Sequence, residues 1–162
     1  MDVLYLFKKM GIRPRRTIRC VLFANEENGM YGATYYANYA KNNKKEIHYA
    51  AIESDAGGHT PRGFSMDALP DAQKNALNKA QKWREILVPY GLYDMQAGGS
   101  AADIGKLRDL GTILFGFKAD SQRYFDFHHA QTDVFENVNK RELQLGAGAM
   151  AALVYFIDKY GF

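Results

Sequence analysis

The chain has 162 residues, 47% of them hydrophobic, and a formal net charge of +3 at pH 7. This length and apolar content suffice for one buried core, so we expect a single globular domain over residues 1–162 and exclude a disordered or fibrous chain. The small charge excludes an extended nucleic-acid footprint, since the basic residues are spread out apart from a short cluster in a solvated turn. No apolar run approaches the roughly 20 residues of a membrane span, so we expect a soluble protein with neither nucleic acid nor membrane as a partner. The basic cluster consists of Arg13, Arg15, Arg16 and Arg19.

The first quarter of the chain alternates between helix and strand patterns. Residues 2–10 have apolar side chains at helical spacing and precede Gly11, which predicts the last turns of an amphipathic helix. Residues 17–25 form an apolar run typical of a buried strand, and residues 30–43 predict a helix with a polar end. The single cysteine, Cys20, excludes an internal disulfide, and its place in the apolar run predicts a buried thiol.

The rest of the chain continues the alternation. Asn139 as N-cap, with Glu142 three residues later, marks the start of the last helix. Strands and helices that alternate in this way favour a three-layer α/β/α fold with a mostly parallel, mixed sheet. The other predicted strands are 47–55, 64–68 and 112–117, and the other predicted helices are 70–87 and 101–111.

Unusual polar residues follow the predicted strands. Glu26 and Glu27 come directly after the first strand, Glu53 and Asp55 end the second, and His129 and Asp133 lie in the loop after the last one. Because the carboxyl ends of parallel strands meet at one edge of a sheet, we expect these three segments to converge there.

Two adjacent glutamates suggest a division of roles. Side chains next to each other at a strand end point in different directions, so one carboxylate can bind a cation while the other moves protons. A divalent metal would offset the repulsion between gathered carboxylates, whose pKa values would otherwise rise. Carboxylate and imidazole ligands together suit zinc. The alternative is that each carboxylate only caps a helix or solvates a loop, but their joint placement at strand ends favours the metal.

Four ordered blocks of the sequence closely resemble consecutive blocks of the co-catalytic zinc exopeptidases, the family that includes bacterial leucyl aminopeptidases and carboxypeptidase Q. The resemblance covers essentially the whole chain and implies a zinc-exopeptidase-like fold without its N-terminal strands. The blocks are "VLFANEENGMYGATYYA", "AIESDAGGHTPRGF", "GGSAADIGKL" and "YFDFHHAQTDVFENVNKREL".

Carried over residue by residue, the resemblance implies a role for each polar residue of these blocks. Glu26 matches the general base that takes a proton from water, and Glu27 matches a ligand of one zinc. His129 matches a second ligand of that zinc, because the family's histidine precedes an aspartate by four positions and Asp133 stands there. Asp55 matches a ligand of the second zinc.

Three further residues are expected beside the metals. Asp103 matches an acidic family position near the substrate pocket, and capping of the following helix is an equal alternative. His128 is expected to neighbour the metal ligands rather than bind metal itself. Asp133 completes the four-residue spacing and is expected near the same site.

One family block has no counterpart in this chain. In the family an upstream block supplies a histidine and an aspartate that bridges both zincs. Without it, one zinc keeps Glu27 and His129 and the other keeps only Asp55, whereas catalytic zinc ordinarily has three protein ligands. The family binds two zincs per site, and we expect one or none for this chain alone. The chain is then a fragment of a longer peptidase, a weak metal binder, or a protein that borrows ligands from a partner.

Two functions remain as hypotheses. The resemblance implies a zinc-dependent exopeptidase, of aminopeptidase or dipeptidase type, that hydrolyses terminal bonds of peptide substrates. The alternative is a non-catalytic truncated homologue that serves as a binding module. Absent N-terminal strands would uncover apolar surface, so we expect a homo-oligomer or completion by the missing segment. A glycosidase is disfavoured, because adjacent carboxylates are poorly placed to flank a sugar. Relatives are often exported, but the sequence leaves the compartment and the substrate preference open.

Overall fold

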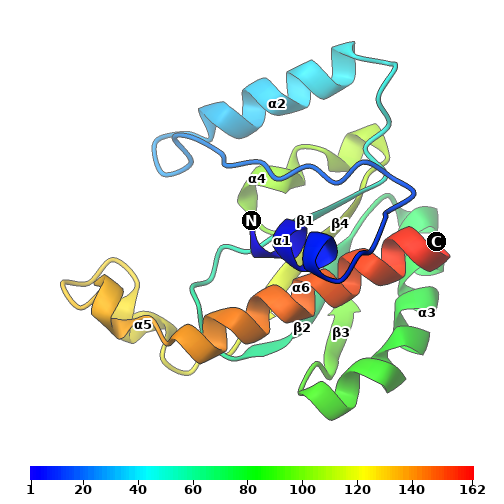
Figure 1. Cartoon of the computed structure of the whole chain (residues 1–162). Coiled ribbons are helices and arrows are strands. Elements are labelled where there is room, and N and C mark those ends of the chain that lie inside the picture. Colours follow the sequence, from blue (N-terminus) through cyan, green and yellow to red (C-terminus); the bar gives the residue numbers. More distant parts are fainter.

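A four-stranded sheet forms the centre of the computed structural model, which describes residues 1–162 (Figure 1). The strands lie in the order β1-β4-β2-β3. β1 pairs with β4 and β2 with β3 in parallel, whereas β2 and β4 are antiparallel. The predicted mixed, mostly parallel sheet is therefore confirmed. The strands are β1 (Ala50–Glu53), β2 (Pro61–Asp67), β3 (Asp94–Ala97) and β4 (Ile113–Ala119).

Six α-helices accompany the sheet. The predicted helix over 70–87 is confirmed as α3, and the cap of α6 is confirmed because the Asn139 side chain accepts the N–H groups of Arg141 and Glu142. The Glu142 carboxylate accepts a hydrogen bond from the Thr60 hydroxyl, and so ties α6 to the chain after β1. The helices are α1 (Asp2–Lys9), α2 (Tyr31–Asn42), α3 (Pro70–Leu87), α4 (Ala102–Gly105), α5 (Tyr124–Phe127) and α6 (Lys140–Tyr160), with short 3-10 turns at Val88–Tyr90, Arg108–Leu110 and Phe135–Asn137.

The helices cover both faces of the sheet. On one face α3 and α6 enclose the main core, where the rings of Trp83 and Phe156 stack with centroids 5.6 Å apart above Phe115. On the other face α2 and α4 pack on Leu114 through a smaller cluster. This arrangement confirms the predicted three-layer architecture (Figure 1).

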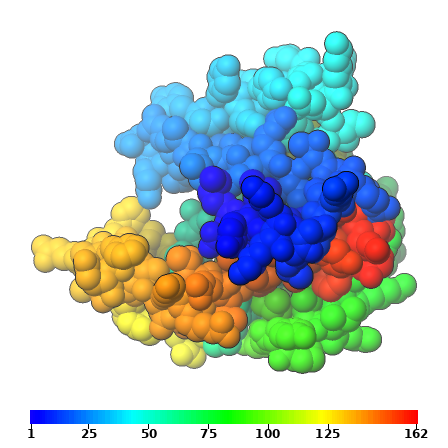
Figure 2. All heavy atoms as spheres, in the orientation of Figure 1, coloured from blue at the N-terminus to red at the C-terminus, as the bar shows by residue number.

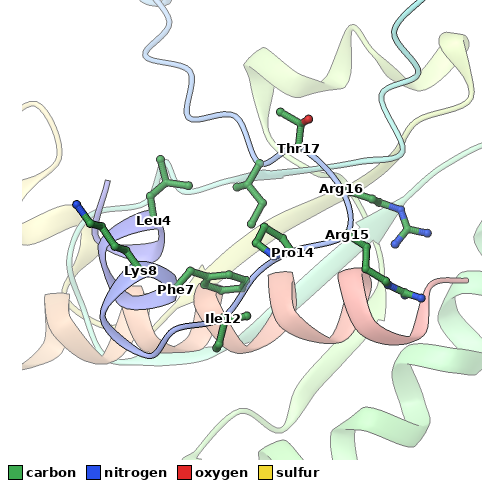
Figure 3. Close-up of a pocket in the computed structure, with 9 residues that line it drawn as sticks. Leu4, Phe7, Lys8, Ile12, Pro14, Arg15, Arg16 and Thr17 are labelled. Carbon is green, nitrogen blue, oxygen red and sulfur yellow. The ribbon is translucent and has the colours of Figure 1, made fainter.

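The segment after α1 is fastened to the end of α6. The residue Asp158 is 9% exposed, and its carboxylate accepts the backbone N–H groups of Arg15 at 2.9 Å and of Arg16 at 3.0 Å. Both guanidinium groups donate to carbonyls at the end of α6, and that of Arg16 lies 4.2 Å from the ring centroid of Tyr49. Figure 3 shows Arg15 and Arg16 directed at this end of α6, beside an open hollow of about 470 Å³ next to α1. These two arginines therefore have a structural role.

The prediction of a strand over residues 17–25 is wrong. The backbone of residues 17–23 makes no hydrogen bond to another backbone group, and Figure 1 shows an irregular segment below α2. Phe23 still packs, since its ring lies edge-on against Tyr36 at 5.8 Å, whereas Leu22 is 85% exposed. The prediction of a buried Cys20 is wrong for the same reason: outside a sheet layer, the thiol is exposed.

Other boundaries differ less. β1 occupies only four residues of the predicted strand 47–55, and the predicted helix over 101–111 is α4 followed by a 3-10 turn. β3 was not predicted, because its sequence, DMQA, has no β-branched residue and its pairing with β2 is a tertiary contact. No helix combines the length and the apolar character needed to span a membrane.

Candidate functional site

A tight turn carries the two adjacent glutamates. The carbonyl of Glu26 accepts the N–H groups of Gly29 at 3.1 Å and Met30 at 3.0 Å. Asn25 and Met30, at either end of the turn, have φ values of 64° and 55°, which are uncommon for residues other than glycine. The turn leaves Glu26 half-buried and Glu27 exposed.

Gly32 fixes this turn to α2. Its N–H donates to the carbonyl of Ala24 at 3.0 Å, and a Cβ at Gly32 would lie 2.5 Å from that oxygen. We therefore expect Gly32→Ala to push α2 away from the turn and to lower the free energy of unfolding by about 1–3 kcal/mol. Urea denaturation measures this change. The control is Gly148→Ala, at an exposed helical position with no atom within 4 Å. Equal stability of Gly32→Ala and the wild type would contradict the assignment.

The loop after β4 meets the turn. The Nε2 atom of His129 lies 3.7 Å from the Oε1 atom of Glu27, and both side chains are more than half exposed. His128 packs beside this pair, since its ring stacks on Tyr124 at 4.6 Å and meets His129 edge-on at 4.2 Å. The Asp133 side chain makes no hydrogen bond or ion pair, so only His129 of this loop contacts a glutamate of the turn. Figure 2 shows the surface hollowed between the blue N-terminal segment and the yellow loop.

Three more carboxylates lie within electrostatic range of each other. Desolvation raises the pKa of Glu26, and the charges of Glu27, Asp55 and Asp103 raise it further. Desolvation also raises the pKa of Asp103, with a further contribution from Asp55 that Lys106 opposes. The buried Oδ1 atom of Asp103 has no hydrogen-bond partner, an uncommon state for a buried oxygen. Glu26, Asp55 and Asp103 thus form a region that favours a cation or a proton.

The sequence assigned no role to Glu53. Its half-buried carboxylate accepts the N–H groups of Asp103 at 3.3 Å and Ile104 at 2.8 Å, and so links the end of β1 to the start of α4. The sequence signal for it was its place with Asp55 at the end of the predicted strand.

Backbone strain gathers around these residues. Only four non-glycine residues of the chain have positive φ, and each lies at or within three residues of a candidate site residue. Such conformations cost free energy and persist where the surrounding structure imposes them, which is common at functional sites. The four are Asn25, Met30, Ala101 and His129.

The ionisation of Asp103 provides a test of this electrostatic description. In the unfolded chain its pKa is ordinary, about 3.9, and folding raises it. Stability is therefore lost as the pH rises through the raised pKa, because the folded state binds the proton more tightly. We expect Asp103→Asn to raise the metal-free melting temperature by about 2–5 °C at pH 7, with a smaller gain at pH 4.

Thermal unfolding at both pH values measures this effect, and Asp109→Asn on the exposed 3-10 turn is the matched control. A gain for Asp103→Asn that is the same at pH 4 and pH 7 would contradict a raised pKa.

Carboxylate oxygens and imidazole nitrogens are atoms that zinc binds, and two of the candidate ligands lie close together. No group of three or more histidine, cysteine, aspartate or glutamate side chains converges to hold a metal. Glu27 and His129 do meet, whereas Asp55 does not join them. Ligands at about 2.0–2.1 Å from a tetrahedral zinc lie about 3.3 Å from each other. The separation of 3.7 Å between Glu27 and His129 therefore requires a shift of only a few tenths of an ångström.

Comparison with known proteins identifies the family. Residues 1–154 match the sequence pattern of peptidase family M28. The chain belongs to this family. Carboxypeptidase Q of Xenopus laevis is 31% identical to the M28 chain over 156 residues, and human carboxypeptidase Q is 28% identical over the same length. Both alignments cover 96% of the chain and 32% of the relative, so the M28 chain spans about a third of the length of these relatives.

A solved structure supports the same assignment. The crystal structure of a peptidase M28 precursor from Shewanella amazonensis SB2B superimposes with a TM-score of 0.78 at 26% identity. The match covers 93% of the M28 chain and 33% of that protein. The α/β/α arrangement of this chain is therefore an M28 fold.

Proposed function

We propose that this M28 chain carries catalytic and zinc-binding residues of an exopeptidase that hydrolyses terminal peptide bonds, of aminopeptidase or dipeptidase type. The observation that carries the proposal is the contact of Glu27 with His129 beside the half-buried Glu26. Family membership supports a peptidase, and the name of the carboxypeptidase Q relatives, which denotes action at a chain terminus, supports the exopeptidase class without deciding between the two types.

Glu27 and His129 would hold one zinc, and Asp55 would bind a second. Bound zinc would acidify water and polarise the carbonyl of the substrate. Glu26 accepts the proton of the attacking water and returns it to the leaving amine. Asp103 and the neighbouring carboxylates favour a cationic group of the substrate, and His128 packs against the ligand histidine.

The zinc ligands beyond Glu27 and His129 would come from residues that do not contact this pair in the structure. Two protein ligands meet, whereas catalytic zinc ordinarily has three. We propose that residues beyond this chain, or a second copy of it, complete the set.

A non-catalytic binding module is the second candidate. It is favoured by the lack of any group of three metal-binding side chains and by exposed apolar residues such as Leu22 and Ile47, 85% and 90% exposed. Apolar surface of this kind is commonly buried in an assembly.

Turnover and light scattering separate the two candidates. With added zinc, the exopeptidase hydrolyses dipeptide or aminoacyl-amide substrates, and chelation removes the activity. A module shows no turnover at any zinc concentration and forms a homo-oligomer at micromolar concentration. Zinc-dependent turnover by a monomer would exclude the module.

A further inference from the structure

Glu53 connects two segments that are distant in sequence. It is the last residue of β1 and lies opposite Gly116 of β4 in the parallel register. Its two carboxylate oxygens accept N–H groups from Asp103 and Ile104, 50 and 51 residues further along the chain. One side chain therefore joins the strand that leads to Asp55 and the turn that carries Asp103.

The segment held by Glu53 has little support of its own. α4 contains four residues, too few to be stable alone, and its N-cap residue Ala101 has a φ of 92° and provides no side-chain cap. The N–H groups at its start are instead satisfied by Glu53. A second tether lies earlier in the loop, where the Ser65 hydroxyl donates to the carbonyl of Gly99 at 2.6 Å. Without Glu53, the loop would keep the Gly99 tether and the packing of Ile104 on Leu114, but the N–H groups of Asp103 and Ile104 would lose their acceptor.

Both oxygens of the Glu53 carboxylate are used in this contact. The side chain is half-buried, and its oxygens accept the N–H groups of Asp103 at 3.3 Å and Ile104 at 2.8 Å. The carboxylate therefore holds the start of α4 at two successive residues.

We propose that Glu53 is a positioning residue, which fixes Asp103 relative to Asp55 and Glu26 by holding the first N–H groups of α4. This inference rests on the proposed function in treating those three carboxylates as one site. The contacts that carry it, however, can be tested without turnover or metal.

The test compares Glu53→Ala and Glu53→Gln with the wild type in the full chain by NMR. Glu53→Ala removes both acceptors, so the Ile104 amide should exchange with solvent at least about tenfold faster, as expected for loss of a charge-assisted hydrogen bond. The ¹³C resonance of the Asp103 carboxyl should shift in Glu53→Ala and return most of the way in Glu53→Gln, which lacks the same charge but keeps an acceptor, so loss of charge alone does not explain this pattern. Glu53→Gln keeps one acceptor and should restore most of the protection. Glu46→Ala, which removes an exposed ion pair with Arg19, is the control and should change neither signal.

Unchanged Ile104 exchange in Glu53→Ala would overturn the inference. Faster exchange with an unmoved Asp103 resonance would also overturn it, because Glu53 would then only cap α4. Failure of the proposed function has a different signature: the wild-type chain would bind no zinc and hydrolyse no peptide, while the Ile104 and Asp103 signals would still respond to Glu53→Ala.

Discussion

Glu26→Gln will lower the rate of peptide hydrolysis by a factor of about 10²–10⁴ without weakening zinc binding, because glutamine cannot accept the proton of the attacking water. The physical basis is the environment of the carboxylate. Desolvation and the charges of Glu27, Asp55 and Asp103 raise its pKa. Glutamine has the same size and removes one repelling charge, so the turn should keep its shape.

The measurement is kcat of the zinc-loaded protein on a dipeptide, together with zinc affinity from chelator competition. Glu85→Gln, on the exposed side of α3, is the matched control and should keep full activity. If Glu26→Gln hydrolyses peptide as fast as the control, another group is the base. If it loses zinc, Glu26 is a ligand.

Asp158→Ala will produce the largest loss of stability, about 3–5 kcal/mol in the free energy of unfolding. Asp158 is buried, and its carboxylate accepts the backbone N–H groups of Arg15 and Arg16, which alanine leaves without a partner. The Arg16 guanidinium, 4.0 Å from the carboxylate, would also lose this negative charge, although the bonds of both guanidinium groups to the α6 carbonyls remain.

Urea denaturation of Asp158→Ala and of the exposed control Asp109→Ala measures this effect. The helix α1 and the segment after it should lose hydrogen-exchange protection before the sheet does, because they are fastened through Asp158. A loss below about 1 kcal/mol, within the range of an ordinary surface substitution, would show that this contact does not hold the segment.

Local sequence signals predicted the helices well. Pro70 opens α3 and Asn139 caps α6, and both signals act within one turn of a helix, so they can be read without knowledge of the rest of the fold. Strands depend on partners. Residues 17–25 have a strand pattern but no paired neighbour, and β3 has a weak pattern but a neighbour in β2.

The candidate site was also predicted only in part, because some of its contacts depend on segments that are distant in sequence. The family resemblance paired Glu27 with His129, which the structure brings to within 3.7 Å of each other, although no strand precedes Glu27. Glu53 received no role of its own, because its hydrogen bonds depend on where α4 packs. Asp133 was expected near the site because it lies four residues after His129. Its side chain is exposed and makes no hydrogen bond or ion pair with another site residue.

Zinc affinity of the Glu27→Ala and His129→Ala variants tests the central claim most directly. Competition with a chromogenic chelator should show that each substitution weakens zinc binding at least about tenfold, whereas His48→Gln, outside the site and bonded to Tyr36, should bind zinc like the wild type. Zinc affinity that is equal in the wild type, Glu27→Ala and His129→Ala would contradict a metal site built on this pair.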